Sequence, residues 1–381
     1  MCTLGFPMAT GLCLKAIGDE MVLSDTQRGL VGGTKMVGLM IAILASGFLS
    51  DRFGFRPFLI VGALCNLVGF TVMSQSEGFG VLLVGAAVAG VGIGMGDALL
   101  SPLACATFRE RRTRVMNLIH AFYPVGIVLM ILLTMGMRSL GWDWRDAFML
   151  LGLAAVPYGV AVAVIRLPQQ SHEGDDRQGT RQILSHGVFW LLSAGIMLGA
   201  ITELGPAEWI ASFIEIATEQ MEQAETAAAL GLLLFAVSMA VGRLCVSRIV
   251  DRLGARRLFV SACLVCVVCI VLAAAPLGAW LGERLDTWLT VFWLAALGFA
   301  VSGLWPTVLG CAGDRFPRGG ASMFAMLGAM GSLGGFIGPV TIGAVADAHN
   351  LRVGLGVLAA APLLAVGVGM MLPRGTGTGA G

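Results

Sequence analysis

The chain consists of twelve long apolar runs, separated by short breaks rich in charged residues, glycine or proline. A helix of about 20 apolar residues is long enough to cross the hydrocarbon layer of a bilayer. Charged residues make up only 12% of the chain, about half of the roughly 25% that is typical of soluble domains. The pattern therefore predicts an all-α membrane protein with about twelve transmembrane helices, surrounded by the lipid bilayer.

The predicted spans form two groups of six. The first group covers residues 1–18, 28–50, 57–74, 79–107, 115–137 and 145–166, and its first run is barely long enough to cross. The second group covers residues 187–213, 226–249, 258–280, 287–312, 320–346 and 352–373. The longest polar stretch, PQQSHEGDDRQG, lies between the groups. We expect an N-terminal six-helix bundle over 1–166, a cytoplasmic linker over 167–186, a C-terminal six-helix bundle over 187–373, and a short polar tail over 374–381.

The distribution of basic residues predicts the orientation in the membrane. With both termini in the cytoplasm, fifteen of the 24 lysines and arginines fall in cytoplasmic loops and five fall outside, while four lie within spans. Basic residues concentrate in cytoplasmic loops of membrane proteins. We therefore expect a multi-pass protein of the plasma membrane, specifically a bacterial inner membrane, with both termini in the cytoplasm.

A short charged sequence occurs at equivalent places in the two groups. GFLSDRFGFRP (47–57) and SRIVDRLGARR (247–257) each follow the second span of their group. Four residues recur at a constant offset of 200: Asp51, Arg52, Gly54 and Arg56 match Asp251, Arg252, Gly254 and Arg256. The glycine supplies backbone freedom for a turn, and the aspartate can face the positive end of a neighbouring helix. Such internal repeats are typical of transporters whose halves rock about a central site.

The first copy resembles the loop motif G-x-L-x-D-R-x-G-x-R of the major facilitator superfamily. This resemblance implies that the repeated residues, together with Gly47, form a conformational latch on the cytoplasmic side; Ser247 replaces the first glycine in the second copy. Alternatively, these charges only set the topology of the loops.

Within that superfamily, several segments resemble the fucose:proton symporters and their sugar-carrying relatives. They are GIGMGDALLSP (92–102), RVMNLIHAFYPVG (114–126), TELGPAEW (202–209), GLWPTVLG (303–310) and GGFIGPVTIGAVAD (334–347), which resemble the fourth, fifth, seventh, tenth and eleventh helices. The chain departs from the pattern at Gly11, where the fucose carrier has an acid, and at Ser101-Pro102, which replaces Asn-Pro. The resemblance implies transport of a sugar-like solute, coupled to protons.

Three polar residues of the fourth and fifth spans are candidates for this chemistry. Asp97 lies near the middle of its span with no charged neighbour, where an ionised carboxylate costs at least a few kcal/mol. Asn117 and His120 are three residues apart and share a helix face, and histidine can relay protons. We predict Asp97 and His120 for proton coupling and Asn117 for solute binding, with hydrogen bonding between packed helices as the alternative role.

The seventh and tenth spans supply further candidates for solute binding: Glu203, Trp209 and Trp305. A carboxylate accepts hydrogen bonds from hydroxyl groups, and an indole face can stack on the apolar side of a sugar ring. Gly205-Pro206 is expected to break the seventh helix between Glu203 and Trp209. Alternatively, Trp209 is an interfacial anchor, with Glu203 near the headgroups.

Three basic residues within spans need an explanation of their own. Lys35 requires a partner or a wet cavity, whereas Lys15 can extend along the helix toward the headgroups. We expect Arg243 to support the adjacent loop.

The favoured function is a secondary active transporter that moves a small polar, sugar-like solute by alternating access, coupled to a proton or another ion. No nucleotide-binding loop or hydrolase constellation is found in the sequence, so we expect neither an enzyme nor a cofactor, and no metal. The net charge of +1 gives no indication of a nucleic-acid partner, and the fold needs no second subunit, so we expect a monomer. The alternatives are a drug or metabolite exporter of the same fold and a non-transporting receptor; against the exporter, AFYPVGIVLMILL lacks the G-x-x-x-G-P-x-x-G-G pattern of many exporters.

Overall fold

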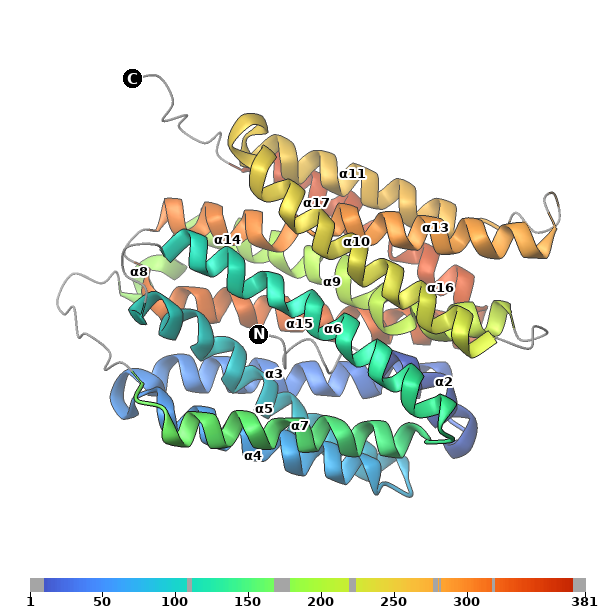
Figure 1. The fold of residues 1–381 in the computed structure, drawn as a ribbon. Helices are drawn as coiled ribbons and strands as arrows, with labels where there is room; N and C mark the ends of the chain where they lie inside the picture. Colours follow the sequence, from blue (N-terminus) through green and yellow to red (C-terminus); the bar gives the residue numbers. More distant parts are fainter. Residues whose placement is uncertain are drawn as a thin grey trace.

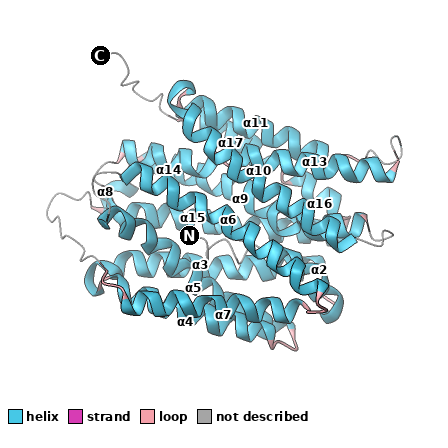
Figure 2. Cartoon of the chain, in the orientation of Figure 1, coloured by secondary structure: helices cyan, strands magenta, loops and turns pink. Residues whose placement is uncertain are grey.

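The fold is known from a computed structural model, which describes residues 10–107, 112–167, 179–218, 224–276, 280, 282–316 and 319–372. All regular secondary structure in these ranges is helical, as Figure 2 shows. The predicted all-α fold is thus confirmed. The predicted polar tail and most of the predicted linker lie outside the described residues.

The first half of the chain forms one helix for each predicted span: α2 (Thr10–Met21), α3 (Asp25–Phe53), α4 (Phe55–Ser74), α5 (Phe79–Thr107), α6 (Arg112–Ser139) and α7 (Trp144–Val164). Helix α3 is longer at both ends than its predicted span, because polar residues continue it beyond the apolar run. At its start, the Ser24 hydroxyl accepts the backbone N–H of Gln27, and the Gln27 side chain accepts the N–H of Ser24. This capping box stabilises a helix end that lies outside the apolar run.

The second half begins with the short α8 (Thr180–Leu184) and continues with six spans, two of which are broken. The helices are α9 (Gly187–Ala217), α10 (Ala224–Leu253), α11 (Ala255–Ala274), α13 (Glu283–Val301), α14 (Leu304–Arg315), α15 (Gly320–Ala348), α16 (Leu351–Val357) and α17 (Ala360–Met371). Pro306 and Pro362 each lie in the first turn of the helix after a break, where a missing N–H costs nothing. Helix α11 ends before the predicted 280, because Ala275 precedes Pro276 and adopts an extended conformation.

Ten segments of the described chain are long and apolar enough to cross a membrane, and the broken pairs α13–α14 and α16–α17 count as one each. Helix α6 adds a shorter apolar stretch, Phe122–Met137. Of the predicted first span, residues 1–9 lie outside the described chain, and α2 extends it to Met21.

The expected break in the seventh span is wrong. Helix α9 is continuous, with Pro206 inside it. A neighbouring helix supports this stretch, because the backbone of Gly338 in α15 lies against Gly205. Proline is tolerated inside membrane helices when packed neighbours and local adjustments satisfy the freed backbone groups.

The turn predicted from the repeated sequence is confirmed in both halves. Gly54 separates α3 from α4 with a φ of 77°, and Gly254 separates α10 from α11 with a φ of 78°. Both angles lie in the left-handed region that side chains with a Cβ rarely adopt. The two halves therefore reverse direction by the same device, 200 residues apart.

The helices lie roughly along one common axis, and successive spans point in opposite directions (Figure 1). Helices α3 and α9 each pack against helices of the opposite half. We call the end that carries α8 the linker end and the opposite end, where α3 starts and α9 stops, the far end. Helix α3 packs along α15 and α5, while α9 packs along α15 and α2. The contact between α3 and α15 is close: a Cβ at Gly29 would lie 2.6 Å from the carbonyl oxygen of Pro339. Small residues of this kind let membrane helices approach closely.

Candidate functional site

Helix α9 carries three buried glutamates, each of which faces a basic residue from a different helix. We call Glu203, Glu208 and Glu215 the α9 acidic ladder. They lie about 21, 14 and 3 Å from the far end of α9, at a rise of 1.5 Å per residue. Buried carboxylates in a membrane protein are costly and are normally paired. The ladder thus extends charge from the far end to the middle of the bundle.

The innermost glutamate forms an ion pair within the second half. The Glu203 carboxylate lies 3.5 Å from the guanidinium of Arg243 on α10, and both side chains are mostly buried. The guanidinium also lies 5.5 Å from the ring centroid of Tyr123 on α6, within cation–π distance. The described partner of Arg243 is thus a glutamate of α9, and the expected contact with the adjacent loop stays a prediction.

Tyr123 brings a side chain of the first half to this ion pair. Its ring comes from α6, whereas Arg243 and the Glu203 carboxylate beside it come from α10 and α9. A ring from the first half therefore lies against the arginine of the second half. This arrangement creates a polar centre between the halves.

The middle glutamate pairs across the two halves. Glu208 lies 3.8 Å from the ammonium group of Lys35 on α3, and the two side chains are 3% and 1% exposed. Lys35 also donates a hydrogen bond to the Thr10 hydroxyl of α2, at 3.3 Å. The partner that Lys35 required is thus Glu208.

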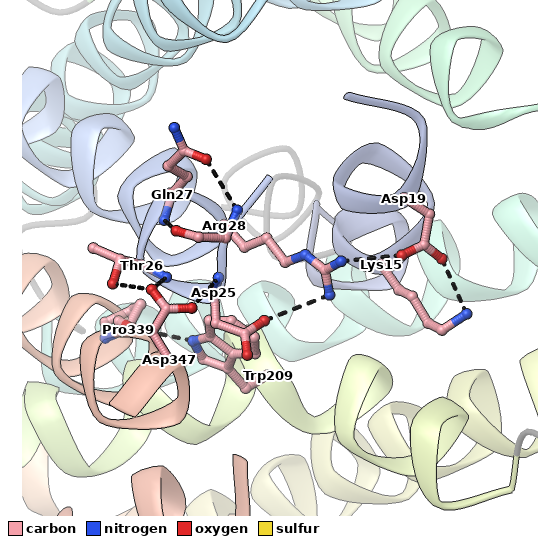
Figure 3. A network of polar contacts seen from close by, with 10 residues as sticks. Lys15, Asp19, Asp25, Thr26, Gln27, Arg28, Trp209, Pro339 and Asp347 are labelled. Carbon is pink, nitrogen blue, oxygen red and sulfur yellow. Dashed lines mark hydrogen bonds and ion pairs between the residues drawn. The ribbon is translucent and has the colours of Figure 1, made fainter. Parts of the chain in front are cut away.

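The outer glutamate and a second contact join the halves at the far end. Lys15 of α2 lies 3.5 Å from Glu215 and 3.1 Å from Asp19, so it is paired rather than extended toward the headgroups. The carboxylate of Asp347 on α15 accepts the backbone N–H groups of Asp25 and Thr26 at 2.7 and 2.9 Å. It also accepts the Thr26 hydroxyl, and Figure 3 shows all three bonds at the start of α3.

The predicted coupling residues are only partly described by the structure. Asp97 lies on α5 and is half-buried; no ion pair within the described residues involves it. The side chains of Asn117 and His120, on α6, lie outside the described part of the chain, so these two predictions stay predictions.

The two predicted tryptophans differ in their surroundings. The Trp209 side chain is 1% exposed, and its indole N–H donates to the carbonyl oxygen of Pro339 at 3.1 Å (Figure 3). In this conformation it packs against α15. Trp305 is half-buried, and its ring lies over Gly331 of α15, where a Cβ would collide with it.

The predicted latch is described only in part. The side chains of Asp51, Arg52 and Asp251 lie outside the described residues. Gly47 lies close to Ala325 of α15, and the Arg56 guanidinium donates to the carbonyl oxygen of Ile165 at the end of α7. Arg252 is exposed and Arg256 half-buried.

A pocket among the described residues lies away from the polar centre. It has a volume of about 250 Å³ and lies at the far end, between α2, α6, α9 and α10. Its lining consists of Leu12, Thr134, Met135, Ser139, Glu215, Thr226, Ala228 and Ala229. The pocket therefore lies two helical turns from Glu208.

Glu208, Arg243 and Tyr123 were not predicted as site residues. A charge inventory of the spans contains the missing signal: the two lysines of the whole chain lie in the first two spans, two acids lie in the seventh, and Glu215 follows it by two residues. Since buried charges need partners, lysine–glutamate pairing between the halves could have been proposed, although not which acid meets which lysine.

Comparison with known proteins agrees with this architecture. The sequence matches the profile of the Major Facilitator Superfamily over residues 3–282 and 209–378. An uncharacterized MFS-type transporter of Mycobacterium tuberculosis is 24% identical over 362 residues, which are 91% of this chain and 83% of that protein.

Shorter matches involve proteins named as sugar transporters. The arabinose-proton symporter of Bacillus subtilis is 31% identical over 152 residues, 36% of this chain and 33% of that protein. The glucose transporter GlcP of Staphylococcus epidermidis is 23% identical over 175 residues, 44% of this chain and 38% of that protein. In these two matches the chain spans well under half the length of the relative.

The profile extends over nearly all of the sequence, including the ten candidate membrane spans and the two turns at equivalent positions. The protein is a multi-pass membrane transporter rather than an enzyme. The chain belongs to the Major Facilitator Superfamily.

Proposed function

We propose that this protein is a secondary active transporter that moves a small, polar, sugar-like solute together with a proton. The observation that carries the proposal is the polar centre between the halves, where Glu203 and Arg243 of the second half meet Tyr123 of the first. Charged groups at this depth in a membrane protein mark solute and ion pathways. The relatives named as an arabinose-proton symporter and a glucose transporter support a sugar as the solute class.

In this proposal the two halves rock about the polar centre and expose it to one side of the membrane at a time. Carboxylates accept hydrogen bonds from the hydroxyl groups of the solute, and aromatic rings contact its apolar faces. We assign Asp97 of α5 and His120 of α6 to proton coupling, and Glu203 of α9 and Asn117 of α6 to recognition of the solute hydroxyl groups. Trp305 is the candidate aromatic platform, because it is half-buried, whereas Trp209 is fully buried in this conformation.

We further propose that the linker end faces the cytoplasm of a bacterial cell, with both termini inside, and that the protein acts as a monomer in the inner membrane. The bias of arginines toward the loops of the linker end supports this orientation. The repeated loops at Gly54 and Gly254 then form the cytoplasmic latch of the two halves.

The test is uptake into proteoliposomes that contain the purified full chain. Radiolabelled arabinose, xylose and glucose are offered separately, with and without an imposed pH gradient that makes the outside acidic. Accumulation above equilibrium that requires the gradient is the expected result. Uptake that only equilibrates, whatever the gradient, would overturn proton coupling, and binding without flux would favour a receptor. Flux of none of these sugars, but of an apolar drug against the gradient, would favour an exporter.

Asp97→Asn tests the coupling residue predicted from the sequence. The asparagine keeps the size of the side chain and an acceptor oxygen but cannot hold a negative charge. We expect it to lose accumulation driven by the pH gradient. Unchanged accumulation would remove Asp97 from the coupling mechanism.

A further inference from the structure

We propose that Glu208 is a proton-binding site of the transport cycle and that Lys35 is the counter-ion that the proton replaces. The site lies between the halves, about 14 Å from the far end of α9. The inference rests on the proposed function for its role in transport, but the proton site itself can be tested without any solute.

The geometry of the pair is poor for a structural ion pair. The distance of 3.8 Å between the Lys35 Nζ and the Glu208 Oε2 exceeds a normal hydrogen bond. The second carboxylate oxygen, Oε1, is buried and has no hydrogen-bond partner among the described residues. A buried ion pair offsets its desolvation cost only when the geometry is good and the remaining lone pairs are satisfied. Packing alone therefore does not account for two charges at this place.

Among the described residues around Glu208, the charged partner is Lys35. Helix α3 lies so close that a Cβ at Gly32 would be 2.8 Å from the carboxylate carbon of Glu208. The neutral Thr10 hydroxyl of α2 accepts a hydrogen bond from Lys35, and the phenol ring of Tyr123 on α6 lies against Arg243. The next charged groups are engaged elsewhere: Glu203 of α9 with Arg243 of α10, Glu215 with Lys15 of α2, and Asp347 of α15 with the start of α3. Among the described residues, Lys35 is thus the one cation within ion-pair distance of Glu208.

The two partners differ in what they retain when the halves separate. Lys35 and its hydrogen-bond acceptor Thr10 both belong to the first half, so the ammonium group keeps that contact. Glu208 belongs to the second half, whose described residues give its buried Oε1 no hydrogen bond. A buried carboxylate without a counter-charge is strongly unfavourable and neutralises by binding a proton. Separation of α3 from α9 therefore favours proton uptake by Glu208.

The proton balance follows from this asymmetry. One proton from the water on the open side binds the Glu208 carboxylate as the Lys35 ammonium group leaves it. When the halves close again, the returning ammonium group replaces the proton, which is released to water, and no other bond is made or broken. Proton uptake is thereby tied to the movement of the halves, even where the solute contacts other residues.

The matched control lies on the same helix. Glu215 is seven residues from Glu208, on the same face of α9, and it also pairs with a lysine of the first half, Lys15. It lies at the far end rather than in the middle of the bundle. Glu208→Gln and Glu215→Gln therefore remove the same charge from the same helix face at two depths.

The first experiment needs no solute. Infrared difference spectra of the purified full chain between alkaline and acidic pH report the C=O stretch of protonated carboxylic acids. We expect a band that appears on acidification in the wild type and in Glu215→Gln and is missing in Glu208→Gln. In Lys35→Met we expect that band at alkaline pH as well, because the counter-ion is gone. An unchanged band in Glu208→Gln would overturn the proposal; should that variant fail to fold, the absence of an alkaline band in Lys35→Met would do so.

The second experiment separates proton coupling from transport itself. With arabinose as the probe, a gradient of about two pH units can sustain about a hundredfold accumulation of a solute that moves with one proton. We expect Glu208→Gln to lose this accumulation, falling to equilibrium, and to retain exchange of labelled for unlabelled arabinose at equal pH. Full accumulation by Glu208→Gln would contradict the coupling role. If the wild type itself moves no sugar, the proposed solute is wrong, while the infrared result still decides the proton site.

Discussion

The contact between Asp347 and the start of α3 offers the most direct test of how the far end is held closed. Without Asp347, the first backbone N–H groups of α3 lose their acceptor, because the Ser24 hydroxyl accepts only the N–H of Gln27. Loss of a helix cap costs about 0.5–2 kcal/mol. Asp347 serves two N–H groups and one hydroxyl, but its side chain is exposed to solvent. We therefore expect Asp347→Ala to cost about 1–2 kcal/mol, a change of about 5- to 30-fold in local opening.

Hydrogen exchange measures this opening amide by amide. The peptide that contains the first turn of α3 should exchange about 5- to 30-fold faster in Asp347→Ala than in the wild type. Asp347→Asn, which keeps one acceptor oxygen, should give a smaller change. Asp314→Asn removes an exposed acid from α14 and serves as the control. Equal exchange of this turn in Asp347→Ala and in the control would refute the reasoning, because it would mean that Asp347 does not hold α3.

Three further substitutions test the site and the fold. Arg243→Met leaves the Glu203 carboxylate buried without its partner, so thermal unfolding should show a loss of about 3–5 kcal/mol; adding Glu203→Gln should restore most of it, and no restoration would disprove the pairing. Gly54→Ala forces a Cβ into a left-handed turn and should cost about 1 kcal/mol, whereas Gly78→Ala, which has open space around it, should cost less. Trp209→Phe loses a buried hydrogen bond and should lower stability by about 1 kcal/mol with arabinose uptake retained; loss of uptake at unchanged stability would return Trp209 to the solute site.

The fold was largely predictable because its signals are local or periodic. Apolar runs report membrane helices directly, and a glycine within a repeated charged sequence reports a turn. The errors came from prolines: Pro206 was expected to break α9, while breaks occurred before α14 and α17. A proline by itself does not determine whether its helix breaks, because a packed neighbour such as Gly338 can support a continuous helix.

The candidate site was less predictable for a different reason. The role of Asp97 could be predicted, because an isolated charge in the middle of an apolar run is visible in the sequence. Glu208 could not be predicted in the same way, because it lies near other polar residues. Its importance comes from Lys35, a residue of another helix in the other half.

The sequence by itself determined that this chain spans a membrane, where its helices lie, and where both halves turn. It also determined the local cap of α3, because Ser24 and Gln27 are three residues apart and need no other helix. Only the tertiary structure decided that Asp347, separated from Asp25 by 322 residues, completes that cap, and that Lys35 meets Glu208. Periodicity fixes which residues share a face of one helix, whereas the packing of whole helices fixes which faces meet.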